Sequence, residues 1–451
     1  MHDIDTYVTD NEHRYLTVLL RYVSQPSVST TGEGVPQAAA LAAELMTSVG
    51  LSAQVVPTPG APVVLGRADG TPGGPHVLVY GHYDVQPPGP PDQWHSPPFE
   101  PEVRDGRIYG RGTGDNKGQH LAHLFGLEAL RATRGDLPCS VTVLLDGEEE
   151  VGSPHLPWFA RHHRDLLDAD LVLWSDGPVY ENGQPCVCLG VRGILKFALR
   201  ARGAGYPTHS GNWGGVSPNP AWRLVQLLAT MRAPDGRVLV DGFYDDVRPF
   251  TAQETAMLDK LPVDLPRALE TLGVTALDAP ADRGFHERLA AWPTLSINTL
   301  SCEDAGEHRT VIPSVAVAGC DVRMVDDQRS EVVAEQIRAH VARVAPDVDF
   351  IPEAAMEPSR TPVSAGYLDA IVAGVTAGFG VEPLVVPSLG GSLPLYTFTG
   401  LLGLPCYGVP LANVDEANHA PNENLELWRF FAGIRASAAI LTSLGEVPHL
   451  P

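Results

Sequence analysis

The chain has 451 residues, too many for one ordinary hydrophobic core, so we expect two or more domains. Its net charge of −23, from 31 basic and 54 acidic residues, argues against nucleic acid and anionic membranes as partners. Apolar residues make up 44% of the chain, but no apolar run approaches the ~18 residues of a membrane span.

Helices and strands are predicted to alternate along the first 180 residues. A helix is expected over 10–24, and a second begins near Pro36 and ends at Gly50. Later elements are strands at 53–57, 62–66, 77–80, 137–145 and 171–174, and helices at about 117–133 and from about 153 to 166. This alternation predicts an α/β fold with a mainly parallel sheet flanked by helices.

From about residue 190 the pattern changes to longer strands with fewer helices. Strands are expected at 190–201, 294–302 and 314–324, and helices at 219–232 and 330–343. We therefore expect residues 190–357 to form a smaller α+β domain inserted into the first. Residues 1–189 and 358–451 would form the domain that holds the site, with helices at about 364–378 and from about 424.

Acids and histidines follow several of these strands. His82 and Asp84 come directly after the apolar run 77–80, and two residues apart in extended chain they share a face. Open α/β sheets build their sites at this end of the strands. Such a pair is a metal ligand with its orienting acid, a general base, or a buried histidine satisfied by a nearby carboxylate.

Several other chemistries lack their motifs. The chain has no G-x-S-x-G, no G-x-x-x-x-G-K-[ST] and no H-E-x-x-H, which disfavours serine hydrolases and phosphate-loop enzymes. What remains is a set of acids with two histidines: His82, Asp84, Asp115, Glu148, Glu149, Glu150, Asp176 and His419. Gathering these charges in one cleft would cost several kcal/mol without cations. Mixed histidine and carboxylate ligands suit zinc or a similar divalent ion, and two ions bridged by a carboxylate would neutralise the cluster.

Five sequence blocks resemble those of the dinuclear zinc exopeptidases and amidohydrolases, in the same order. They are 82–87, 107–118, 149–153, the strand end at Asp176, and 417–424, and the inserted domain adds a similar block at 208–215. This family includes carnosinases, cytosolic non-specific dipeptidases, glutamate carboxypeptidases, aminoacylases and succinyl-diaminopimelate desuccinylase. Two residues resemble those found at the same motif positions in the dipeptidase branch: Gln86, and Thr310 before Val-Ile-Pro.

The resemblance implies a role for each matching residue. Two divalent metal ions are expected, with zinc preferred and manganese or cobalt as alternatives. The metal ligands would be His82, Asp115, Glu150, Asp176 and His419, with Asp115 bridging both ions. Asp84 would contact only His82 and orient it, and Glu149 would be the general base that activates a metal-bridging water. The peptide bond after Asp115 is commonly cis in this family.

The inserted domain carries further matching residues. His209 would reach the active site of a partner subunit and stabilise the oxyanion, which implies a homodimer through residues 190–357. Thr310, Arg323, Gly391 and Ser392 would contact substrate. The planar fork of Arg323 suits a substrate carboxylate.

The predicted function is hydrolysis of an amide bond in dipeptides or short peptides with a free carboxylate. An N-acyl-amino-acid amidohydrolase using the same site is one alternative, and an inactive relative that only binds a peptide or metabolite is another. The acidic N-terminus carries no secretion signal and the six cysteines are scattered, so we expect a cytoplasmic protein with reduced thiols.

Overall fold

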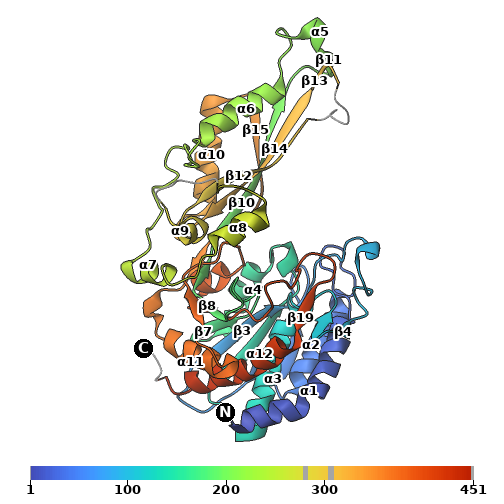
Figure 1. Ribbon diagram of the computed structural model, residues 1–451, viewed down its shortest axis with the longest axis vertical. Helices are drawn as coiled ribbons and strands as arrows, with labels where there is room; N and C mark the ends of the chain where they lie inside the picture. The colour runs from blue at the N-terminus through green and yellow to red at the C-terminus, as the bar shows by residue number, and fades with distance from the viewer. Residues whose placement is uncertain (1, 278–282, 303–308, 448–451) are drawn as a thin grey trace. The chain divides into compact units, whose positions relative to one another are not determined.

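The computed structural model describes residues 2–277, 283–302 and 309–447, which fall into two compact units (Figure 1). Unit 1 comprises Met1–Gly190, Arg360–Pro387 and Pro394–Pro451, and unit 2 comprises Val191–Ser359 and Ser388–Leu393. The short segment 388–393 was expected in the first domain but belongs to unit 2. The reason is local hydrogen bonding, because the backbone N–H of Arg192 donates to the carbonyl oxygens of Leu389 (3.2 Å) and Gly391 (3.0 Å).

Unit 1 is built on an eight-stranded sheet in the order β1-β2-β6-β3-β7-β18-β8-β17. Its strands are β1 (Ser52–Val56), β2 (Val63–Ala68), β3 (His76–His82), β6 (Ser140–Asp146), β7 (Leu171–Trp174), β8 (Cys186–Cys188), β17 (Leu384–Val386) and β18 (Cys406–Gly408). Four of its pairs are parallel, namely β6–β3, β3–β7, β7–β18 and β8–β17. The mainly parallel sheet is therefore confirmed. Because β6, β3 and β7 run in the same direction, their carboxyl ends meet at one edge.

The helices of unit 1 are α1 (His2–Val23), α2 (Val35–Ser48), α3 (Lys117–Arg134), α4 (Leu156–His162), α11 (Leu368–Phe379) and α12 (Leu427–Leu444). Helix α3 packs against both α1 and α12. The start predicted for α1 was wrong, because the helix begins eight residues earlier than residue 10. Ile4 and Val8 extend its buried face. Asp3 and Asp5 in the first turn stabilise this end of the helix, because their negative charge lies near the positive end of the helix dipole. A smaller sheet joins β4 (Glu102–Arg104), β5 (Arg107–Tyr109) and β19 (Asn424–Glu426).

Helix α3 carries a buried histidine whose titration is linked to folding. His123 Nδ1 lies 3.0 Å from Ser437 Oγ, and its Nε2 lies 2.7 Å from Ser175 Oγ. Burial lowers the pKa of His123 to about 4. The unfolded chain binds this proton near pH 6.5, and the folded chain binds it only near pH 4, so protonation favours unfolding between these values.

We expect this histidine to destabilise the fold as pH falls from about 6.5 to 4, by up to ~1.4 kcal/mol per pH unit. Urea unfolding of wild type and His123→Gln across this range measures the effect. The glutamine variant keeps polar groups near both serines but cannot titrate, so its free energy of unfolding should fall less steeply. Equal slopes for the two proteins would contradict the assignment.

Unit 2 is an antiparallel sheet with helices packed on it. Its strand order is β12-β14-β10-β15, formed by β12 (Thr294–Cys302), β14 (Val315–Met324), β10 (Gly193–Arg202) and β15 (Val348–Met356). Helices α6 (Pro220–Met231) and α10 (Ser330–Val344) contact this sheet, and Phe197, Leu224 and Ile337 lie fully buried in its core. A two-stranded ribbon joins β11 (Thr208–His209) to β13 (Val311–Ile312), and the one-turn helix α5 (Ser210–Trp213) follows β11.

In the described part of unit 2, the one-turn helix α5 and three further short helices were not predicted: α7 (Ala252–Leu258), α8 (Leu265–Leu272) and α9 (Phe285–Ala290). The sequence carries N-cap residues at the start of α7 and of α8. Thr251 and Glu254 form a capping box at α7, and Asp264 caps α8 through the backbone N–H of Arg267. Within the described residues, no helix combines the length and the apolar character needed to cross a bilayer.

Candidate metal centre

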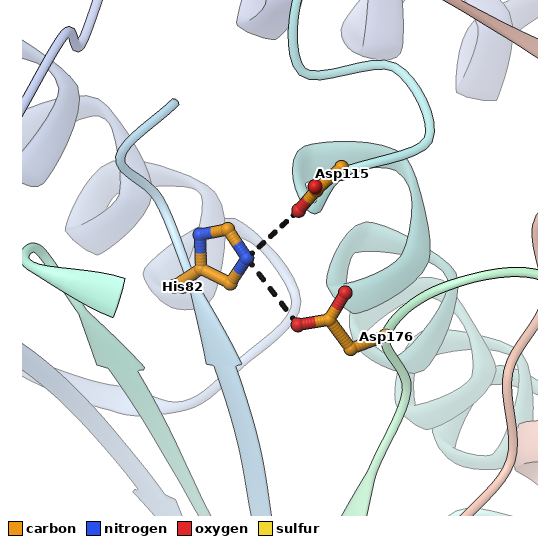
Figure 2. A group of neighbouring side chains, drawn as sticks. All are labelled: His82, Asp115 and Asp176. Atoms are coloured by element: carbon orange, nitrogen blue, oxygen red, sulfur yellow. Dashed lines mark ion pairs between the residues drawn. The ribbon is translucent and has the colours of Figure 1, made fainter. Parts of the chain in front are cut away.

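Five predicted ligands form two adjoining groups in unit 1. Figure 2 shows the first group, in which the side chains of His82, Asp115 and Asp176 point toward one another. His82 ends β3 and Asp176 follows β7, and these strands are parallel neighbours, so their carboxyl ends bring the two side chains together. His82 Nε2 lies 3.1 Å from Asp115 Oδ1 and 3.4 Å from Asp176 Oδ2.

Asp115 also belongs to the second group, with Glu150 and His419. Its other oxygen, Oδ2, lies 3.1 Å from His419 Nε2, and Glu150 Oε2 lies 3.2 Å from the same nitrogen. The side chain of His82 is fully buried, whereas that of His419 is 54% exposed. One carboxylate therefore faces both groups, with one oxygen toward each.

The donor set fits divalent cations. Among the described residues, no hydrogen-bond partner meets the buried His82 Nε2, although carboxylate oxygens lie on two sides of it. A buried ring nitrogen in that position lacks a partner that a cation would supply. Two imidazoles and three carboxylates are ligands for zinc and similar borderline ions.

The protonation of this site shows how strongly its charges are coupled. Burial raises the pKa of Asp176 and of Glu150, and the nearby Asp115 carboxylate raises both further. Hydrogen bonds with Asp115 and Glu150 raise the pKa of His419 to about 10. Burial lowers the pKa of His82, but the three aspartate carboxylates around its ring raise the pKa to well above its usual range. Without cations, the raised pKa values of Asp176, Glu150 and His419 favour their protonated forms, and bound metal ions would displace those protons.

Asp84 contacts more than was predicted. Its Oδ1 lies 3.3 Å from His82 Nδ1, which agrees with an orienting role. Its two oxygens also accept hydrogen bonds from the backbone N–H groups of Glu149 and Glu150, each at 3.1 Å. The prediction that Asp84 contacts only the histidine was wrong. This carboxylate fixes the turn that carries Glu149 and Glu150 as well as the imidazole.

Glu149 begins a short 3-10 turn over Glu149–Val151. Burial raises the pKa of Glu149 well above its usual range, and the Asp176, Glu150 and Asp115 carboxylates add to this against the opposing effect of His82. A general base needs a raised pKa of this kind. The preceding Glu148 faces elsewhere, because its Oε2 pairs with His155 Nδ1 at 2.7 Å.

Two residues near this centre had no predicted contact. The side chain of Asn116 accepts from the backbone N–H of His82 (3.3 Å) and donates to the carbonyl oxygen of Ser175 (2.6 Å), so it bridges the ends of β3 and β7. The amide of Gln86 donates to Glu150 Oε2 at 2.9 Å. Gln86 had been noted only as a mark of the dipeptidase branch. The Asp115–Asn116 peptide bond is cis, as the resemblance implied.

The remaining predicted residues form two groups within unit 2. His209 Nε2 lies 3.4 Å from Thr310 Oγ1, and its Nδ1 accepts from the backbone N–H of Gly211 at 3.0 Å. Arg323 Nη1 donates to Ser392 Oγ at 2.8 Å. The turn that carries Gly391 and Ser392 is held by the backbone N–H of Arg192.

The mainly parallel sheet and its strand-end donor groups define a metal-dependent hydrolase. The model of Peptidase family M20/M25/M40 matches residues 78–443, and the chain belongs to this family. Membership implies divalent metal ions, which the donor groups fit.

Relatives and solved structures agree with this assignment. The Beta-Ala-His dipeptidase of Rattus norvegicus is 28% identical over 87% of this chain and 82% of the relative. A Cys-Gly metallodipeptidase of Schizosaccharomyces pombe is 28% identical over 98% and 97% of the two chains. The chain also resembles an M20 family metallo-carboxypeptidase from Sulfolobus solfataricus, with a TM-score of 0.89, 30% identity, and coverage of 96% and 99%. Human carnosine dipeptidase 1 has a TM-score of 0.82, 26% identity, and 99% coverage of both chains.

Proposed function

We propose that this protein hydrolyses dipeptides or short peptides with a free carboxylate, using two divalent ions, with zinc preferred. The observation that carries this proposal is Asp115, whose two oxygens each face one donor group. His82 and Asp176 would complete one metal position, and Glu150 and His419 the other. Dipeptidases among the relatives support the substrate class.

The chain's own residues supply the proton transfers. When bound, the ions would polarise the scissile carbonyl and lower the pKa of the attacking water. Glu149, whose pKa is raised by burial, takes a proton from the attacking water and passes it to the leaving amine. Asp84 holds the backbone of Glu149 during both transfers, so the base stays in place.

Two groups in unit 2 are proposed to contact substrate. Arg323 presents a guanidinium that already donates to Ser392 Oγ, and together they offer donors for a substrate carboxylate. The imidazole of His209 is exposed beside Thr310, where it is available to another subunit and to the oxyanion there.

A homodimer through unit 2 is part of the proposal. Strand β12 lies at the edge of its sheet, and Ile297 and Leu300 on it are more than half exposed. Near His209, Trp213 and Val216 are also exposed. Exposed apolar side chains on an edge strand suit pairing with a second copy. A full-length protein that sediments as a monomer would contradict the role of His209 in a partner's site. The proposed location is cytoplasmic, in accord with the six free cysteines.

We expect Gly-Leu to be hydrolysed with a kcat/KM at least about 10-fold above that of N-acetylleucine. The reason is the charged amino group of Gly-Leu, because a hydrogen bond to a charged group contributes about 1.5–3 kcal/mol. The two substrates differ only in the amino group, which makes them a matched pair. The assay uses protein reconstituted with zinc, manganese or cobalt, with bound metal measured in each sample.

Each outcome of this assay selects one function. Faster cleavage of N-acetylleucine would favour the amidohydrolase alternative. No cleavage of any dipeptide by fully metal-loaded protein would favour the inactive relative that only binds.

A further inference from the structure

Another buried carboxylate, that of Glu423, contacts the loop of Asp115 and was assigned no function. Glu423 is fully buried, and its Oε1 accepts hydrogen bonds from the backbone N–H groups of Gly112 (3.1 Å), Gly114 (3.0 Å) and Asp115 (3.0 Å). Its Oε2 accepts from Arg111 Nη1 at 2.7 Å and also from Gly112 at 3.1 Å. The loop thus wraps its amides around one carboxylate, as backbone amides do around a bound anion.

Arg111 supplies the counter-charge for the buried Glu423 carboxylate. The side chain of Arg111 is 1% exposed, and that of Glu423 is 0% exposed. A buried carboxylate without a counter-charge would be strongly destabilising, and a close, hydrogen-bonded arginine offsets the cost of desolvation. Arg111 also donates to the carbonyl oxygen of Pro87 at 3.3 Å, so the cation is held from a second side.

Glu423 lies in one loop of the metal centre and contacts another. Glu423 follows His419 by four residues in the same loop, while Asp115 belongs to the loop that enters α3. The backbone N–H of Gly110 also donates to the carbonyl oxygen of Glu423, at 3.0 Å. One residue therefore ties the loop that presents His419 to the loop that presents Asp115.

We propose that Glu423, neutralised by Arg111, is a positioning residue that sets the spacing of the two metal positions. It does so by fixing the backbone of Asp115, the carboxylate that both positions share. The inference rests on the proposed two-metal site. It assigns Glu423 no contact with metal or substrate, and its effect passes through the Asp115 amide and the His419 loop.

The test is metal titration of the metal-free full-length protein by calorimetry, with zinc as the probe, on wild type, Glu423→Gln and a control. The amide of Glu423→Gln carries N–H groups that face Arg111 and Gly112, so it cannot accept all five hydrogen bonds. We expect the dissociation constants of both metal positions to rise at least about 10-fold, as for other residues that orient metal ligands. The control is Glu426→Gln, which removes a nearby carboxylate whose ion-pair partners are Arg107 and Arg429. Its dissociation constants should match those of wild type.

A second variant keeps the test valid if Glu423→Gln does not fold. Glu423→Asp retains the charge for Arg111 but shortens the side chain, which withdraws it from the three amides. It should also weaken both positions and lower kcat more than it raises KM. Wild-type zinc dissociation constants in a folded Glu423→Asp protein would overturn the inference. Failure of wild type itself to bind two zinc ions would instead overturn the proposed function, so the two failures are distinguishable.

Discussion

Replacing Glu149 by glutamine is expected to lower kcat about 10²- to 10⁴-fold while both metal positions stay filled, because the variant removes only the group that transfers protons. Glu149 is buried beside the ligand carboxylates, and burial raises its pKa, as proton transfer to and from water requires. Glutamine has nearly the same shape, so the turn that Asp84 holds should persist. Steady-state kinetics on Gly-Leu with metal analysis of the same sample measures the effect.

Glu148→Gln is the matched control for this experiment. Glu148 is the neighbouring residue and is chemically identical, but its carboxylate pairs with His155 and accepts from the backbone N–H of Ala61. Its replacement should leave kcat close to that of wild type. A Glu149→Gln enzyme as active as Glu148→Gln on every hydrolysed substrate would show that another group is the base.

Asp115→Ala is expected to release both metal ions and lower activity at least about 10³-fold, since the ions supply several kcal/mol of transition-state stabilisation. Each donor group contains three residues, and Asp115 belongs to both, so its removal leaves two ligands at each position. Elemental analysis after gel filtration should find less than one ion per chain.

Asp176→Ala provides the comparison, because Asp176 belongs to the first group alone. This variant should lose the ion near His82 and keep the one held by Glu150 and His419. If Asp115→Ala retained two ions per chain, the bridging assignment would be wrong. Equal metal loss in the two variants would also contradict it.

Much of the fold was predictable because its signals are local. The strand that ends at His82 and the helix at Lys117 follow from apolar runs and the residues that end them. Parallel neighbours then bring successive strand ends together, so the candidate ligands could be inferred without distances. Helix α8 escaped prediction for the opposite reason. It is eight residues long, so its sequence offers only about two turns of periodicity, although Asp264 caps its start.

The contacts around the ligands were not predictable, since they join distant parts of the chain. Glu423 accepts from Asp115 across 308 positions of sequence, and no periodicity connects the two. Asn116 and Gln86 likewise act through hydrogen bonds whose partners are fixed only by the tertiary fold. Asp84 shows the same limit, because its pairing with His82 was visible in the sequence while its hold on Glu149 was not.

Because segment 388–393 belongs to unit 2, this unit is formed by two separate stretches of the chain, which constrains how chimaeras with homologous proteins can be built. The chain passes between the units four times, after residues 190, 359, 387 and 393. A graft of residues 191–359 from a homologue would bring its own counterpart of Arg323 but meet the host's Ser392, and its counterpart of Arg192 would have to bind the host's Leu389 turn. Recombination that moves the unit as one continuous cassette would therefore separate residues that hydrogen-bond to each other. Chimaeras should keep these contacts only if both segments are taken from the same parent.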